Sequence, residues 1–368
     1  MIVLEIVFWA SAAALAWTHL GYPALAWLVS RLSRRPVRKG GALPTVTFIV
    51  AAHNEEDVIE RRVENLLALD YPPEKLEIVV ASDASTDGTN EIVERIAARE
   101  PRVRLLRCPR GGKVAAQNLA VRESSGEILA FSDANSLWAV PALRKIVRNF
   151  ADPDVAYVFG QHRYEAPDGT NRESAYMRFE TWLRARESEI GSTTGGYGSI
   201  YSVRRSDYVE VDPRFGHDLA LPYVMVQRGR RAVYEPEAIV FEKPSRDIED
   251  EFRRKVRMFE HCWLIVLRGK MLRGLDPMYF VQIVSHRHLR YATGILHVLL
   301  LASNVALIGQ GLVYKITLAL QVAFLAAAAA RPGLPRYYVL VTWATLLALL
   351  RYVRFGVPAV WEKAEGTR

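Results

Sequence analysis

The two ends of this 368-residue chain are almost free of charge, whereas its middle is strongly polar. Between Ile2 and Val29 the only ionisable side chains are Glu5 and His19. A helix of this length, at about 1.5 Å per residue, exceeds the ~30 Å hydrocarbon core of a bilayer. No basic residue precedes the apolar run and no small-residue cleavage site follows it, which argues against a removable signal peptide. We therefore expect a transmembrane helix over residues 1–30.

The C-terminal part of the chain contains three further apolar runs, Tyr291 to Gln310, Leu312 to Ala330 and Tyr337 to Leu350. Each is long enough for a membrane helix or a large part of one. Lys315 and Arg351 lie near the ends of the last two runs. One of these two runs is therefore either a full membrane crossing or a shorter helix, which is a half-span or lies in the membrane interface. We expect about three C-terminal transmembrane helices within residues 291–357.

Basic residues flank both apolar regions on the sides that face the middle of the chain. They are Arg31, Arg34, Arg35, Arg38 and Lys39 after the first region, and His286, Arg287, His288 and Arg290 before the second. Positive flanks stay in the cytoplasm. The presence of only two cysteines excludes a disulfide scaffold and agrees with a reducing compartment. We expect a multi-pass protein of the inner or plasma membrane with its middle domain in the cytoplasm.

Strands and helices alternate in the middle of the chain. The apolar runs Thr45 to Ala52 and Leu76 to Ala81 are typical of strands buried on both faces of a mainly parallel sheet. Helix-like segments lie at Ile59 to Leu69, Asn90 to Arg99 and Val114 to Arg122, and another strand at Glu127 to Phe131. This order predicts an open α/β sheet that binds ligands at the carboxyl ends of its strands.

The boundaries follow from these features. We expect a basic linker over 31–42, an α/β domain over 43–246, an amphipathic region over 247–290 and a tail over 358–368. In the amphipathic region, apolar residues from Ile248 to Leu267 recur at three- and four-residue steps below a basic face. Such a helix lies either in the membrane interface or against a protein core.

Polar clusters follow the predicted strands. The segment Ala52 to Asp57 ends the first strand, and acids there also suit a helix N-terminus. The segment Ser82 to Thr89 matches the ligand spacing of an EF-hand calcium loop, but a strand enters it where an EF-hand has a helix. It offers a carboxylate and hydroxyls to a base or ribose, with a structural Asx-turn as the alternative.

Two further clusters suit a diphosphate. Gly111, Gly112 and Lys113 precede a helix, where a lysine can meet a phosphate, although the spacing is not that of a Walker A motif. Asp133 and Asn135 follow another strand. A carboxylate and a carboxamide so placed can bind Mg²⁺ or Mn²⁺ that carries diphosphate oxygens. By itself such a tripeptide is more often a turn.

Taken in order, seven segments resemble glycosyltransferase family 2, in particular the membrane-bound branch with cellulose, chitin and hyaluronan synthases. They are AAHNEED, ASDASTDGT, GGKVAAQN, FSDANS, TTGGYGSIYSVRR, GHDLALP and EFRRKVRM, from about Thr45 to Met258. The resemblance implies a GT-A fold, a nucleotide-diphospho-sugar donor, Mg²⁺ or Mn²⁺, and inversion at the anomeric carbon. We expect a glycan or lipid-linked acceptor and a lipid bilayer as partners, and no nucleic acid. Because four membrane helices are few for a polymer channel within one chain, secretion of a long product would need homo-oligomers or a secretion partner.

The resemblance assigns roles by position. On the donor side it implies that Ala52, Glu55 and Asp83 contact the nucleoside and that Lys113 contacts the diphosphate. It also implies that Asp133 and Asn135 bind the metal. Arg254 and Arg257 match the polar anchors of the family's QxxRW motif. On the acceptor side it implies Asp218 as the general base, with Gly196 and Tyr197 in the acceptor loop. Direct displacement needs such groups, because a carboxylate must take the acceptor's proton and cations must stabilise the leaving diphosphate.

Four positions depart from the family pattern, namely Ser82, Asn135, His217 and Met258. The first two weaken metal or nucleotide affinity, and His217 replaces the acid before the base. Met258 replaces a tryptophan on which an acceptor sugar stacks, unless Trp263 serves instead after a rotation of the helix.

Our leading hypothesis is a membrane-bound inverting glycosyltransferase. Within the same class, the alternative is a single addition to a polyprenyl phosphate. A dehydrogenase is improbable because it needs G-x-G-x-x-G after the first strand, where this chain has Ala51-Ala52-His53-Asn54. A non-catalytic membrane-surface protein is the third class.

Overall fold

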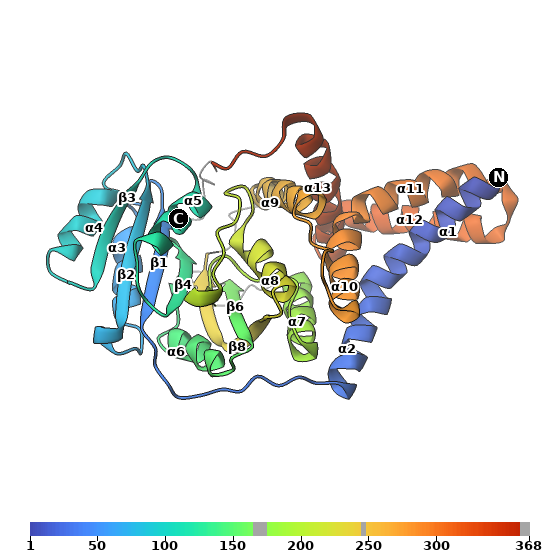
Figure 1. Ribbon diagram of the computed structural model, residues 1–368. Helices are drawn as coiled ribbons and strands as arrows, with labels where there is room; N and C mark the ends of the chain where they lie inside the picture. The colour runs from blue at the N-terminus through green and yellow to red at the C-terminus, as the bar shows by residue number, and fades with distance from the viewer. Residues whose placement is uncertain (165–174, 244–247, 361–368) are drawn as a thin grey trace. The chain divides into compact units, whose positions relative to one another are not determined.

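The chain forms two units, one helical and one built on a β-sheet. The computed structural model describes residues 1–164, 175–243 and 248–360. Among these residues, the helical unit comprises 1–29 and 248–357, and the sheet unit comprises 30–164, 175–243 and 358–360. Figure 1 labels most of the helices and strands of both.

Within the described residues, eight strands form one sheet in the order β3-β2-β1-β4-β7-β6-β8-β5. The strands are β1 Val46–Ala52, β2 Leu76–Asp83, β3 Val103–Cys108, β4 Ile128–Asp133, β5 Leu137–Trp138, β6 Val155–Tyr164, β7 Tyr201–Arg204 and β8 Arg231–Glu242. β1 to β4 are mutually parallel, as are β6 and β8, whereas β7 runs antiparallel between β4 and β6. The predicted mainly parallel α/β sheet is confirmed.

Helices cover both faces of this sheet (Figure 1). They are α3 Ile59–Leu67, α4 Thr89–Ala97, α5 Lys113–Arg122, α6 Ala142–Val147, α7 Ala175–Ile190 and α8 His217–Gln227. Along β1, Phe48 packs into a core with α3, α4 and α6, while its neighbour Ile49 packs into a second core with α5 and α8. Burial on both faces explains why the strand sequences are continuously apolar.

The helical unit holds four helices long and apolar enough to cross a membrane, judged among the described residues by length and composition alone. Its elements are α1 Ile2–Ala16, α2 Tyr22–Leu32, α9 Ile248–Arg268, α10 Pro277–Ile283, α11 Thr293–Leu307, α12 Leu312–Ala330 and α13 Leu334–Phe355. π-helical turns join α1 to α2 at Trp17–Gly21 and follow α10 at Val284–Leu289. α1 packs along α11, and α9 packs along α13.

The orientation of α9 about its axis decides whether Trp263 can stack on an acceptor sugar. Trp263 is buried, and its indole N–H donates to the carbonyl oxygen of Thr345 at 2.8 Å. Its ring is therefore not exposed to an acceptor sugar, and the suggestion that it replaces the missing tryptophan of the QxxRW motif is wrong. Val256 and Phe259 are buried as well, so part of the apolar stripe packs inside the helical unit.

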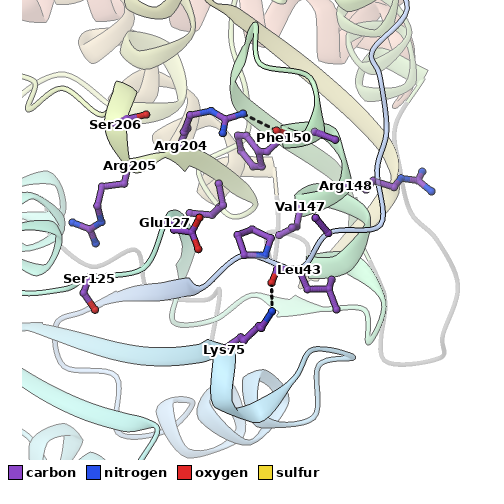
Figure 2. A pocket seen from close by; sticks show the side chains of 14 residues that line it. Leu43, Lys75, Ser125, Glu127, Val147, Arg148, Phe150, Arg204, Arg205 and Ser206 are labelled. Carbon is purple, nitrogen blue, oxygen red and sulfur yellow. Dashed lines mark hydrogen bonds between the residues drawn. The ribbon is translucent and has the colours of Figure 1, made fainter.

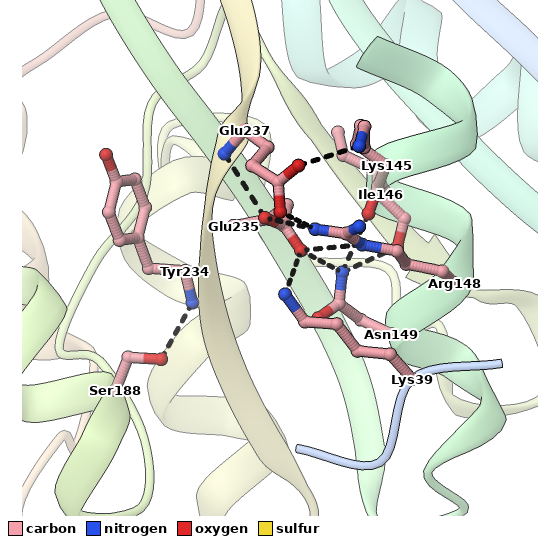
Figure 3. A network of polar contacts seen from close by, with 9 residues as sticks. All are labelled: Lys39, Lys145, Ile146, Arg148, Asn149, Ser188, Tyr234, Glu235 and Glu237. Atoms are coloured by element: carbon pink, nitrogen blue, oxygen red, sulfur yellow. Dashed lines mark hydrogen bonds and ion pairs between the residues drawn. The ribbon is translucent and has the colours of Figure 1, made fainter. Parts of the chain in front are cut away.

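A buried carboxylate fastens the basic linker to the sheet (Figure 3). Glu235 of β8 has a fully buried side chain 2.8 Å from the ammonium of Lys39. Asn149 and Arg148 also donate to it, at 2.9 and 3.1 Å. Burial by itself raises the pKa of Glu235, but these three partners lower it further, and the net pKa lies below the ordinary value.

We expect Glu235→Ala to lower the free energy of unfolding by about 3 kcal/mol, because it leaves a buried cavity and removes the acceptor that Lys39, Arg148 and the buried Asn149 share. Since folding lowers the pKa, this stabilisation is present above the unfolded value of 4.5 and is lost as the pH falls through the folded value. Thermal unfolding of the full chain in detergent between pH 7 and pH 3 measures both effects. Glu237→Ala, at a carboxylate 51% exposed that also binds Arg148, is the control with the smaller expected loss. Equal losses in the two variants would contradict the argument.

Candidate active site

A hollow of about 840 Å³ lies at the edge where the parallel strands begin (Figure 2). Its basic side chains hold backbone carbonyls in place: Lys75 donates to Leu43 at 2.7 Å, Arg204 to Phe150 at 2.7 Å and Arg205 to Gly126 at 2.6 Å. These bonds brace the loops before the strands. Sheets of this kind bind ligands at the opposite, carboxyl edge, where the predicted site residues lie.

At the carboxyl edge, the loops that follow β1 and β2 are hydrogen-bonded to each other. Asn54 adopts a left-handed backbone with φ of 55°, and its side-chain oxygen accepts the N–H of Thr86 at 2.8 Å. The backbone N–H of Glu55 donates to the hydroxyl of Thr89 at 2.8 Å. Ala52 closes β1 opposite Ser82 of β2. The predicted nucleoside residues Ala52 and Glu55 therefore belong to one braced pair of loops.

Asp83, the last residue of β2, organises the glycine loop before α5. Asp83 is 2% exposed as a residue. Its carboxylate accepts the backbone N–H of Gly111 at 2.7 Å and that of Gly112 at 3.0 Å, and it forms an ion pair with Arg110. Gly112 has a φ of +88°, and a Cβ there would clash with the backbone carbonyl of Ala359. The sequence did not indicate a role for Arg110, although this residue directly precedes the Gly111-Gly112-Lys113 segment that was predicted to meet a phosphate.

Residues from three separate motifs meet next to this loop. Lys113, the first residue of α5, forms an ion pair with Asp133 at the end of β4. A Cβ built on Gly198 would lie 3.3 Å from the Lys113 ammonium and 3.8 Å from the Asp218 carboxylate, so both groups flank this glycine. The structure thus brings Lys113, Asp133 and Asp218 together. Arg254 and Arg257 belong to the helical unit, where Arg254 pairs with Glu251 at 2.9 Å.

The surroundings shift the proton affinities of two of these groups. Burial raises the pKa of Asp218, the nearby cations Lys113 and Arg184 oppose this, and the net pKa is above the ordinary value. Burial lowers the pKa of Lys113, but Asp133, Asp218 and Glu242 raise it above its ordinary value. The site therefore combines a permanent cation with a carboxylate whose pKa is shifted toward neutrality, which suits proton transfer.

The predicted acceptor loop is attached directly to Asp218. The backbone N–H of Gly196 donates to the Asp218 carbonyl oxygen at 2.7 Å. Arg184 of α7 donates to the Gly196 carbonyl at 2.7 Å, and its guanidinium lies 4.6 Å from the centre of the Tyr197 ring. The Tyr197 and Thr181 hydroxyls are 2.9 Å apart. The sequence assigned Gly196 and Tyr197 to the acceptor loop by resemblance but gave no sign of Arg184, which contacts both.

Glu242, the last residue of β8, is a further carboxylate that sequence reasoning missed. It accepts from the hydroxyl of Ser136 and lies 2.8 Å from Nε2 of His162. It also acts electrostatically on Lys113. The available signal was its position at a strand end, which is the same signal that identified Asp133.

Asp133 and Asn135 offer oxygen donors on a partly exposed stretch after β4. No group of three or more His, Cys, Asp or Glu side chains suitable for a metal occurs among the residues that the structure describes. Such a donor set fits Mg²⁺ or Mn²⁺ that takes most of its ligands from substrate phosphates and water. It does not fit a metal held by protein groups alone.

The geometry defines an α/β domain with a charged site at the carboxyl edge of its parallel strands, and comparisons with known proteins show what this domain is similar to. Residues 47–211 match the family model for glycosyl transferase family 2. The β-monoglucosyldiacylglycerol synthase of Nostoc sp. (strain PCC 7120 / SAG 25.82 / UTEX 2576) is 32% identical over 213 residues, which cover 55% of this chain and 45% of that protein. The poly-β-1,6-N-acetyl-D-glucosamine synthase of Staphylococcus aureus (strain MSSA476) is 25% identical over 268 residues, covering 69% of this chain and 65% of its own length. The chain thus spans about half to two thirds of these relatives.

One solved structure covers nearly the whole chain. It is the mannosyltransferase PcManGT from Pyrobaculum calidifontis in complex with GDP-Man and Mn²⁺, which is 26% identical with a TM-score of 0.73 and covers 95% of this chain and 99% of that one. The expected resemblance to glycosyltransferase family 2 is thus confirmed over residues 47–211, and the expected GT-A fold is confirmed.

Proposed function

We propose that this chain is a membrane-bound, inverting glycosyltransferase that moves a sugar from a nucleotide-diphospho-sugar to a growing glycan or a lipid-linked acceptor. The observation that carries the proposal is the meeting of Lys113, Asp133 and Asp218 around Gly198 at the carboxyl edge of the sheet. The four apolar helices support a multi-pass membrane location. The basic flanks support a cytoplasmic site.

Asp218 takes the proton of the acceptor hydroxyl as that oxygen attacks the anomeric carbon. The bond from this carbon to the diphosphate breaks at the same time, the diphosphate leaves with the electron pair, and a single displacement inverts the configuration. Lys113 stabilises the negative charge that grows on the diphosphate. Asp133 and Asn135 would hold a divalent ion, which when bound would supply further positive charge to the same group.

The remaining site residues bind the two substrates. On the donor side, we propose that Ala52, Glu55 and the loop held by Asp83 contact the nucleoside. On the acceptor side, Gly196 and Tyr197 orient the incoming sugar or lipid-linked group.

A single addition to a lipid-linked acceptor such as a polyprenyl phosphate is the second candidate. It is favoured by the burial of Trp263 and by methionine at position 258, which leave α9 without the exposed aromatic plate of the QxxRW motif. It is also supported by the near-complete coverage of a mannosyltransferase that binds GDP-Man. Product sizing separates the two, since polymerisation gives a ladder of lengths and single addition gives one product.

The test of the function itself uses the purified full chain in detergent with Mn²⁺, a panel of UDP- and GDP-sugars, and a membrane lipid extract as the acceptor source. We expect one donor to release nucleoside diphosphate faster than the others and to label the extract. Stoichiometric binding of nucleotide-sugars without any release or labelling would overturn the proposal.

Gly198→Ala is expected to slow transfer by about tenfold or more, because its Cβ occupies the space between the Lys113 ammonium and the Asp218 carboxylate. The fold should persist, since Gly198 does not need a left-handed backbone. Gly191→Ala is the matched control, because a Cβ there meets nothing within 4 Å. Initial transfer rates and thermal midpoints of both variants are measured. Equal rates in the two variants would show that Gly198 does not border the reacting groups.

A further inference from the structure

His217 stands immediately before the proposed base, at a position where the family pattern has an acid. It is the first residue of α8 and is 2% exposed. Its Nδ1 lies 2.9 Å from the hydroxyl of Tyr201, and its Nε2 lies 3.4 Å from the hydroxyl of Tyr208. Both ring nitrogens thus face tyrosine hydroxyls inside the protein, on the side away from bulk water.

The hydrogen bonds of the neighbours decide which nitrogen carries the proton. The Tyr208 hydroxyl donates its only proton to the side-chain oxygen of Asn118 at 2.6 Å. Asn118 in turn donates to the carbonyl oxygen of Val211 at 3.3 Å, which fixes the orientation of its amide. The Tyr208 oxygen can therefore only accept from His217, so Nε2 carries the hydrogen and Nδ1 accepts from Tyr201. One neutral tautomer of His217 thus satisfies every hydrogen bond from Tyr201 through Tyr208 to Asn118.

Packing holds this tautomer in place. The imidazole lies edge-on to Phe131 and Tyr208, with ring centres 5.6 and 5.8 Å apart and interplanar angles of 79° and 82°. Phe131 and Tyr201 stack at 4.8 Å behind it. Burial, with a contribution from the nearby Lys113 cation, lowers the pKa of His217 to about 3, so the ring is neutral at physiological pH.

The hydrogen bonds from His217 through Tyr208 to Asn118 join two parts of the proposed active site. Asn118 lies on α5, the helix that begins at Lys113, and His217 lies next to Asp218 on α8. We propose that His217 is a positioning residue that, through Tyr208 and Asn118, fixes Asp218 relative to Lys113. This inference rests on the proposed function, because the distance matters only if Asp218 takes a proton while Lys113 holds the diphosphate. A displacement of about 1 Å can cost about a hundredfold in rate.

Two amide substitutions at position 217 distinguish the hydrogen bond to Tyr208 from the hydrogen bond to Tyr201. In His217→Gln the terminal amide reaches the position of Nε2 and keeps the donor to Tyr208. In His217→Asn the amide reaches only the position of Nδ1, so the contact with Tyr201 remains and the link to α5 is lost. Tyr208→Phe breaks the same link while the aromatic packing around His217 is kept.

The experiment measures kcat, donor KM, nucleoside diphosphate affinity and thermal midpoint for the full chain in detergent with Mn²⁺. We expect His217→Asn and Tyr208→Phe to lower kcat by about ten- to a hundredfold, with nucleotide affinity within about twofold of the native chain, and His217→Gln to stay within about threefold in kcat. The double variant His217→Asn, Tyr208→Phe should lose no more than either single variant, because both break one link.

Three results would overturn the inference: native kcat in Tyr208→Phe, equal kcat in His217→Asn and His217→Gln, or a loss of nucleotide affinity that matches the loss of kcat. If His217→Asn fails to fold, Tyr208→Phe still decides the question. Failure of the proposed function is seen separately, as an absence of donor turnover in the native chain.

Discussion

Asp218→Asn will leave a folded protein that binds the nucleotide-sugar donor but transfers the sugar about 10³-fold more slowly than the native chain. Asparagine keeps the size of aspartate and can still accept a hydrogen bond from an acceptor hydroxyl, but it cannot take the proton. The backbone carbonyl of residue 218 still accepts the Gly196 N–H, so the acceptor loop stays in place. Single-turnover transfer with pre-bound donor separates this chemical defect from any change in binding.

The same substitution should raise the thermal midpoint at pH 7. Folding raises the pKa of Asp218 above its ordinary 3.8, so the ionised carboxylate costs stability, and this cost grows as the pH rises from the unfolded value through the folded one. The Asp218→Asn variant has no such cost, and its advantage should disappear as the pH falls below about 3.8. The measurement is made without donor or metal, because either one changes the charges around the site.

Asp212→Asn, in the loop before α8, provides the control. Its hydrogen bonds with Arg214 lower the pKa of Asp212, which is the opposite shift. We expect this variant to keep its transfer rate and to show a small loss of midpoint at pH 7. Native turnover in Asp218→Asn would remove Asp218 as the base, and a lowered midpoint would contradict the burial argument.

The sequence was sufficient to predict that several candidate site residues lie at strand ends. Continuous apolar runs identified β1 and β2, and in a parallel sheet the residues that follow such strands share one edge. Asp133 could be placed beside the loop of Lys113 for this reason, without knowledge of any long-range contact. The helix predicted over 114–122 differs from α5, Lys113–Arg122, by one residue at its start.

Residues that act through long-range packing escaped prediction. Arg184 faces Tyr197 because of the rotation of α7, and hydrophobic periodicity there indicates a helix without saying which polar side chain meets which loop. The same uncertainty affected Trp263, since an apolar stripe at helical spacing predicts burial or membrane contact equally well. Glu242 was missed because β8 ends far along the sequence from β4, and only the folded sheet brings it to Lys113.

Asp133→Ala should abolish the effect of Mn²⁺ on nucleoside diphosphate binding. In the native chain we expect Mn²⁺ to tighten binding by about tenfold or more relative to EDTA, since Asp133 and Asn135 offer oxygen ligands to an ion that also carries phosphate oxygens. In the variant the two affinities should become equal. Lys113 loses its Asp133 partner at the same time and remains near Asp218, so metal-free binding should persist through this ammonium.

Asn135→Asp tests the same site from the opposite direction, because it restores the second acid of the family's metal motif. An added carboxylate should lower the Mn²⁺ concentration needed for half-maximal binding, because a second anionic oxygen ligand binds a hard cation more strongly than a carboxamide. Calorimetric titration of the full chain in detergent, with nucleoside diphosphate at several Mn²⁺ concentrations, measures both variants. If Asp133→Ala still binds more tightly with Mn²⁺ than with EDTA, the metal is held elsewhere, and the stretch after β4 serves only to place Asp133 against Lys113.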